Sequence, residues 1–159
     1  MKTEHYNRVK DQIGSCGIWC GSCVVGNGTL REITSRYKEI IKNYDLESWA
    51  PRTFDFKEFL KGLEAIGDTP LCQGCQKGGG WEECPMRRCV SGKKIADCSA
   101  CDRPKTCPHI ESLEKMRSGS LRAGLFVKTE DVDRANLLRD WGKKIRTRWP
   151  SSLLFLSED

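Results

Sequence analysis

Ten cysteines carry most of the chemistry that this 159-residue sequence could perform. Six of them form three C-x-x-C pairs, and two thiolates at that spacing can reach one metal ion about 2.3 Å from each sulfur. The stretch CGIWCGSC, residues 16 to 23, contains one pair and a further cysteine, and CQGC and CSAC are the other two pairs. Three such pairs in one short chain favour metal binding over idle thiols. The candidate ligands are Cys16, Cys20, Cys23, Cys72, Cys75, Cys84, Cys89, Cys98, Cys101 and Cys107.

The expected redox environment also favours metal ligation over disulfides. The first residues, MKTEHYNRVKDQIG, are charged and lack the apolar stretch of a secretory signal, and no apolar run approaches the roughly 18 residues of a membrane span. The sequence therefore predicts a cytoplasmic protein that does not engage a membrane. Thiols are kept reduced in that compartment, where clustered cysteines bind metal more often than they pair with one another.

Loop lengths indicate how the cysteines group. Closing a short loop costs little conformational entropy, so neighbours in sequence are the expected partners in a site. A first site is expected from Cys72, Cys75, Cys84 and Cys89. A second site is expected from Cys98, Cys101 and Cys107. An interleaved arrangement, in which the CQGC and CSAC pairs bind the same ion, stays open because sequence fixes the number of ligands better than their pairing.

The second site and the N-terminal triad, Cys16, Cys20 and Cys23, each lack a fourth ligand. Ten cysteines and two histidines would complete three tetrahedral sites. His109 lies two residues after the last cysteine, and His5 lies near the N-terminus. The simpler interpretation places His109 on the solvent side of a helix and His5 in a frayed terminus.

The sequence favours zinc as the metal and leaves an iron–sulfur cluster as the alternative. Four thiolates bind either, and C-x-x-C pairs followed by a helix are commoner in structural zinc modules. An iron–sulfur protein would have an electron-transfer or redox-sensing role. The spacing in residues 16 to 23 also matches radical S-adenosylmethionine enzymes, but residues 24 to 70 offer no strands for the barrel that such enzymes need.

The order of the cysteine motifs resembles that of a known family. CGIWCGSC is followed by CQGC, CPMRRC and CSACDRPKTCPHI, and this order resembles the cysteine-rich family domain of unknown function 3795 over residues 14 to 117. The chain departs from the family pattern at Met86, where isoleucine is usual, and at Trp81, where a cysteine is expected. The resemblance implies a zinc-binding protein and no established activity.

Charge and motifs give two further hypotheses. The net charge of +5 and two basic clusters indicate a zinc-stapled nucleic-acid-binding module as an alternative, although cations near a helix C-terminus are also favoured by the helix dipole. The chain lacks G-x-S-x-G, a phosphate-binding loop and H-E-x-x-H, so catalysis is not expected, apart from an open zinc position at a three-cysteine group. An unidentified protein partner is left open. The clusters are Arg87, Arg88, Lys93 and Lys94, and Lys143, Lys144, Arg146 and Arg148.

The elements that must position the cysteines are mainly helices. Apolar residues recur at three- and four-residue steps over 30–44, and a D-x-x-E capping box at Asp55 begins a second helix that ends at Gly67. A third helix is predicted over 108–116, and a fourth over 130–148 with Thr129 as its N-cap. This helix is predicted to be terminated by Pro150 and to bury one stripe of side chains. The stripe consists of Val132, Ala135, Leu138, Trp141, Ile145 and Trp149.

The central segment, residues 68 to 108, shows little periodicity and cannot hold itself together by burial. Short apolar runs at 125–127 and 153–156 are weak strand signals. The sequence therefore predicts a single, mainly α, small helical domain whose irregular central cysteine-rich segment is stapled by two or three metal sites. Residues 14–67 form its helical N-terminal part with the cysteine triad, and residues 109–159 its helical C-terminal part.

Overall fold

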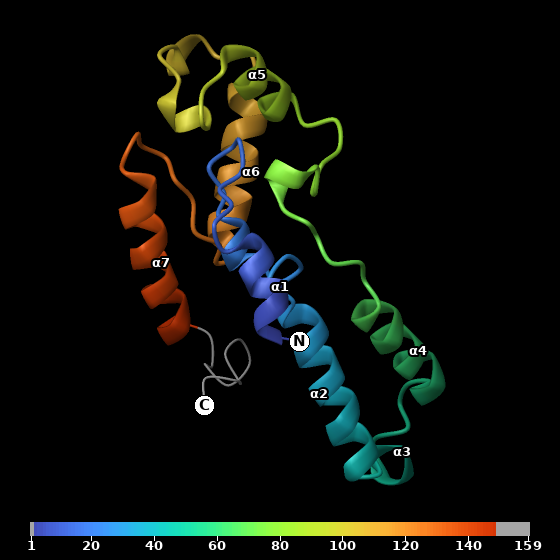
Figure 1. The fold of residues 1–159 in the computed structure, drawn as a ribbon. Coiled ribbons are helices and arrows are strands. Elements are labelled where there is room, and N and C mark those ends of the chain that lie inside the picture. Colours follow the sequence, from blue (N-terminus) through green and yellow to red (C-terminus); the bar gives the residue numbers. More distant parts are fainter. Residues whose placement is uncertain (1, 149–159) are drawn as a thin grey trace.

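The structure, a computed structural model, describes residues 2 to 148 (Figure 1). Helices dominate this range, which contains two isolated β-bridges and no longer strand, so the mainly α prediction is confirmed. Trp149, Pro150 and the apolar run 153–156 lie outside the described residues. The α-helices are α1 (Lys2–Val9), α2 (Thr29–Asn43), α3 (Leu46–Trp49), α4 (Phe56–Gly67), α5 (Pro85–Lys93), α6 (Ile110–Arg122) and α7 (Arg134–Arg148).

Helices α2, α3 and α4, residues 29 to 69, form an arm that extends away from the rest of the chain (Figure 1). The two long helices confirm the predicted helices over 30–44 and 55–67. Asp55 is the N-cap of α4, and its carboxylate accepts a 3.0 Å hydrogen bond from the backbone N–H of Glu58, as the capping box predicts. Thr34 and Ile41 are buried where α2 packs against α4.

The remaining described residues, 2–28 and 70–148, form what we call the body, which contains two buried clusters. In the first, Trp19 stacks on Trp141 with ring centroids 5.7 Å apart, together with Ile13 and Ile145. The second consists of Cys16, Cys84, Met86 and Leu113. Cysteines thus belong to the core of the body itself, and α7 contributes Trp141 and Ile145 of its predicted stripe to the first cluster, with Leu138 packed against it.

The bounds of α6 and α7 differ from the prediction. Helix α6 continues to Arg122. Gly124, two residues later, has a φ of 84° that allows a Schellman motif with a 2.9 Å bond from the Leu125 N–H to the Ser120 carbonyl. Helix α7 begins at Arg134. Asp133, whose carboxylate accepts from the Asn136 N–H at 2.7 Å, therefore replaces Thr129 as the cap.

The predicted buried stripe of α7 is only partly correct. Trp141 and Ile145 are buried, whereas Ala135 is exposed and Val132, which precedes the helix, is 44% exposed. In the central segment α5 was not predicted, although Pro85 at its first turn is a typical helix start. None of the helices in the described residues is long and apolar enough to cross a membrane.

Candidate metal centre

Six cysteines line one cavity of about 210 Å³ in the body. They come from three separate segments of the chain: the N-terminal stretch, the CQGC pair and the start of α5. The cavity is several times the roughly 30 Å³ that one water molecule occupies in the liquid, and it is smaller than the roughly 300–1,000 Å³ of ordinary small-molecule pockets. We call these residues the cavity cysteines: Cys16, Cys20, Cys23, Cys72, Cys75 and Cys84.

Residues 12 to 23 act as the hub that brings these segments together. Their backbone forms hydrogen bonds of 2.8 to 2.9 Å within the stretch and with segments about 80 to 110 residues away in sequence. A bent segment outside regular helices and sheets must satisfy its backbone polar groups in this way. The bonds run from Cys20 to Gln12, from Trp19 to Phe126, from Cys98 to Ser15 and from Lys128 to Gly17.

Two glycines let the CQGC pair approach the hub. Gly74 has a φ of 87°, a conformation that other residues rarely adopt, and the Gln12 amide donates a 3.0 Å hydrogen bond to the adjacent Gln73 carbonyl. A side chain at Gly79 would place its Cβ 2.8 Å from the sulfur of Cys72. The backbone of this segment therefore wraps closely around Cys72, as it does around metal-bound thiolates.

Burial and neighbouring sulfurs raise the pKa values of two cavity cysteines. Burial raises the pKa of Cys20 to about 11, a backbone hydrogen bond from Cys75 opposes the shift, and the neighbouring Cys75, Cys72 and Cys23 add to it. Burial also raises the pKa of Cys16, and the nearby Cys75 and Cys84 add to this shift. Because a thiolate is unfavourable in this environment without a cation, the arrangement suits sulfurs that become ligands of a metal ion.

The other four cysteines lie at the tip of the body, one within α5 and three in the turns that follow it (Figure 1). We call Cys89, Cys98, Cys101 and Cys107 the tip cysteines. Burial raises the pKa of Cys98 to about 12; Arg117 opposes this, and Cys16, Cys107 and Cys89 increase it. At Cys101 the pKa is lowered by a backbone hydrogen bond from Arg103 and by Lys93, whose Nζ lies 3.2 Å from the sulfur.

A buried ion pair fixes the CSAC turn of the tip. The Lys128 ammonium lies 3.1 Å from the Asp97 carboxylate, and their side chains are only 3% and 4% exposed. Asp97 also accepts a 2.8 Å hydrogen bond from the backbone N–H of Ser99. Burial alone would raise the pKa of Asp97, but the hydrogen bonds from Ser99 and Lys128 outweigh it and hold the pKa below its ordinary value. The pair thus holds Cys98 in place through its neighbours.

The cysteine-bearing part of the chain matches a known family. A family model described as protein of unknown function (DUF3795) matches residues 12 to 112. The chain belongs to the DUF3795 family. The matched range includes all ten cysteines, and the resemblance drawn from the order of their motifs is confirmed. No match is found among the curated proteins or the solved structures.

The grouping of cysteines in this DUF3795 chain differs from the one expected from loop lengths. The CQGC pair lies with the N-terminal triad around the cavity, whereas Cys89 lies with the tip cysteines. All ten cysteines are free thiols. Among the described residues, no three His, Cys, Asp or Glu side chains lie at the spacing of a preformed single-ion site. The sulfurs therefore line the cavity wall instead of converging on one point.

The two histidines lie outside the cavity. His109 is the N-cap of α6, two residues after Cys107, and makes no capping hydrogen bond through its side chain. His5 packs against Gly28 at the start of α2, and its Nδ1 is buried without a hydrogen-bond partner. No sequence pattern identifies Gln12, Lys128 and Asp97 as parts of the site, because their roles depend on contacts between distant segments.

The two predicted basic clusters differ in how many of their cations contact other groups of the protein. In the first cluster Arg87 lines the cavity, Arg88 pairs with Glu83 at 3.1 Å and Lys93 contacts Cys101. In the second, Lys143, Lys144 and Arg146 are exposed on α7, and the side chain of Arg148 lies outside the description. The first cluster therefore contacts the cysteine region and does not form a continuous basic face.

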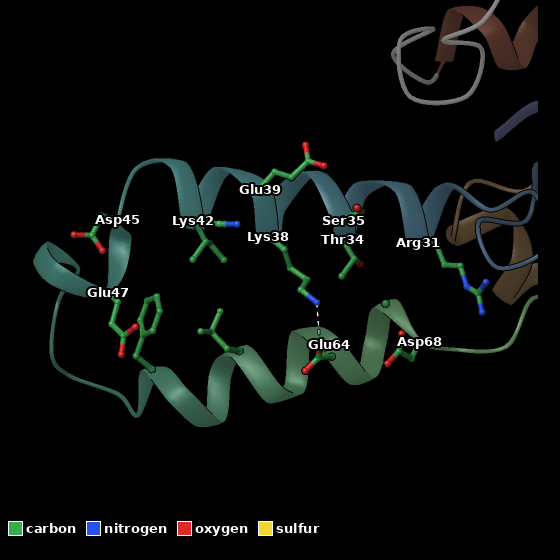
Figure 2. Close-up of a pocket in the computed structure, with 14 residues that line it drawn as sticks. Arg31, Thr34, Ser35, Lys38, Glu39, Lys42, Asp45, Glu47, Glu64 and Asp68 are labelled. Carbon is green, nitrogen blue, oxygen red and sulfur yellow. Dashed lines mark hydrogen bonds and ion pairs between the residues drawn. The ribbon is translucent and has the colours of Figure 1, made fainter. Parts of the chain in front are cut away.

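A larger cavity, of about 770 Å³, lies between α2 and α4 in the arm (Figure 2). Lys38 of α2 and Glu64 of α4 form a 3.1 Å ion pair across it, and Arg31 donates to the Thr69 carbonyl at 3.2 Å. Its walls carry charges of both signs and no cysteine or histidine. The groove is therefore a packing feature of two amphipathic helices, and the cysteine cavity is the better candidate for chemistry.

Proposed function

We propose that the protein binds metal, with zinc as the expected ion, through its cysteines, and that the metal holds the central segment in its fold. The observation that carries this proposal is that cysteines from three separate segments line one cavity. The donor set fits, because thiolates are the preferred ligands of zinc and of iron–sulfur clusters. The close approach of Gly79 to Cys72 also fits a backbone wrapped around bound thiolates.

The proposal assigns four ligands to each of two centres. Cys20, Cys23, Cys72 and Cys75 would hold the first metal, since the other three sulfurs all lie near enough to Cys20 to act on its thiol, and the tip cysteines would hold the second. A closed set of four protein ligands makes a zinc centre structural. Cys16 and Cys84, both buried in the core, would lie between the two centres. His109 would remain a spare ligand next to the tip.

An iron–sulfur protein with an electron-transfer or redox-sensing role is the second candidate. Two features of the cavity favour it: six cysteines exceed the four that one zinc ion takes, and the volume suits a group larger than a single ion. Nucleic-acid binding has less support, because three cations of the first basic cluster are engaged elsewhere. A reducing, cytoplasmic location and a protein partner are further parts of the proposal.

The test is to purify the full chain without oxygen and to measure metal, acid-labile sulfide and the visible absorption spectrum. A zinc protein is expected to be colourless, to contain no sulfide and to hold about two zinc ions for two four-thiolate sites. A brown protein with iron and sulfide in equal amounts would select the second candidate. A protein with neither metal would contradict both.

A further inference from the structure

Arg87 is the one charged residue among the described residues that line the six-cysteine cavity. It lies in the first turn of α5, three residues after Cys84. Its Nη2 donates a hydrogen bond to the carbonyl of Gly79, in the loop that wraps Cys72. Its Nε is buried and has no hydrogen-bond partner. The guanidinium thus lines the cavity with one donor engaged and another, the Nε–H, buried and unused.

A buried donor without an acceptor requires an explanation. The large majority of buried polar groups in folded proteins have a partner, and leaving one without is unfavourable, the more so when the group is charged. The wall around Arg87 offers sulfur, glycine backbone and apolar side chains. A thiolate bound to metal accepts hydrogen bonds, so the missing acceptor is one that metal binding would create from a cavity cysteine.

The negative charge of a metal centre in the cavity also indicates a role for Arg87. Four thiolates around a divalent ion carry a net charge of −2, which is unfavourable in an apolar cavity unless a cation compensates it. The other cations near sulfur serve the second group, because Lys93 contacts Cys101 and Arg117 acts on Cys98. Arginine stays protonated at any physiological pH. Arg87 is therefore placed to compensate the cavity centre.

We propose that Arg87 is a positioning residue of the cavity centre, which donates its Nε–H to a metal-bound thiolate and offsets the negative charge of the centre. This inference rests on the proposed function, because it needs a metal in the cavity. It holds for a zinc ion and for an iron–sulfur cluster alike, since both are anionic when bound by four thiolates. Arg87 is not a ligand, so its loss weakens the centre without removing it.

The neighbouring residue offers a matched control. Arg88 carries the same charge one position along α5, but its side chain is 69% exposed and pairs with Glu83 at 3.1 Å. Arg87→Gln and Arg88→Gln change the charge of the chain equally. Arg87→Lys keeps the charge and removes the planar donor, which tests the hydrogen bond separately from the charge.

The experiment loads the reduced full chain with Zn²⁺ and measures affinity by competition with a chromophoric chelator. Arg87→Gln is expected to weaken one site by about 10- to 100-fold with unchanged stoichiometry, the usual loss when a ligand's hydrogen-bond partner is removed. Arg88→Gln is expected to change affinity by less than about threefold, as for an exposed ion pair. Arg87→Lys should lose at least about threefold, and it replaces Arg87→Gln if that variant fails to fold.

A spectroscopic readout separates this role from a purely structural one. In the Co²⁺-loaded chain, loss of the N–H donor should shift the sulfur-to-metal charge-transfer bands in Arg87→Gln and leave them unchanged in Arg88→Gln. Equal affinities and equal spectra for wild type, Arg87→Gln and Arg87→Lys would overturn the proposal, as would an equal loss in Arg88→Gln. A wild-type chain that binds no metal would instead overturn the proposed function itself.

Discussion

The arm and the body of this protein are stabilised in different ways. In the arm, amphipathic α2 and α4 pack along their length, and the ion pair that joins them, Lys38 to Glu64, is exposed to solvent (Figure 2). In the body, an ion pair is fully buried, cysteines occupy the core, and the hub of residues 12 to 23 is fixed by hydrogen bonds to distant segments. Local sequence therefore determines the arm, and long-range contacts determine the body.

The largest expected difference between the two regions follows metal removal. A strong chelator should abolish hydrogen-exchange protection over residues 70 to 108 and leave it intact in α2 and α4. The reason is that structural metal contributes on the order of 10 kcal/mol to the folding of such segments, whereas the arm has its own apolar interface. Hydrogen exchange with mass spectrometry measures both in one sample. Equal protection of residues 70 to 108 with and without chelator would contradict a structural metal.

The pH dependence of metal binding should reveal that the sulfurs are protonated before the metal binds. The raised pKa values of Cys20, about 11, and Cys98, about 12, keep these thiols protonated from pH 6 to 8, so each must release a proton to bind metal. Affinity should rise with pH by about tenfold per pH unit for each proton released, and fall as the pH is lowered. Calorimetry in buffers of different ionisation enthalpy counts the protons. Release of no protons at pH 7 would contradict protonated, buried ligands.

A pair of matched substitutions compares the two ion pairs directly. Lys128→Met leaves the buried Asp97 carboxylate unpaired and should lower the free energy of unfolding by about 3–5 kcal/mol. Lys38→Met breaks the exposed pair in the arm and should lower it by less than about 1 kcal/mol. Denaturant unfolding of the metal-loaded proteins measures both. Similar losses in the two variants would remove the distinction between the regions.

The smallest effect is expected at the cap of α4. Asp55→Ala removes the acceptor for the Glu58 N–H and should lower the free energy of unfolding by about 1 kcal/mol. Because the cap belongs to the arm, metal content should not change. Asp55→Asn, which keeps a capping oxygen, is the control and should stay close to wild type. A change of metal content in Asp55→Ala would show that the arm and the body are coupled.

The comparison also explains how far the sequence predicted the structure. The helices of the arm could be predicted because apolar spacing over 30–44 and the cap at Asp55 are local signals. The start of α7 could not, because Thr129 and Asp133 are both good caps. The choice depends on Lys128, which binds Asp97, 31 residues away in sequence, as well as Asp131.

The candidate site was predictable in its residues and not in its arrangement. The three C-x-x-C pairs and the four further cysteines near them in sequence indicated the ten residues that lie around the cavity and at the tip. Their grouping was not predictable from loop lengths, because the hub brings Cys20 next to Cys75 across 54 intervening residues. The roles of Gln12 and Arg87 also depend on such contacts, and no spacing rule identifies them.

The most direct test of the central claim is the metal content of Cys20→Ser compared with wild type, both purified without oxygen. Cys20 lies in the cavity among Cys23, Cys72 and Cys75, so its loss should remove about one metal site and leave the tip centre occupied. Ser22→Ala, which removes a buried hydroxyl that accepts from the Phe126 N–H but removes no thiol, is the matched control: it should lower stability and still keep the full metal content. An unchanged metal content in Cys20→Ser would contradict the account.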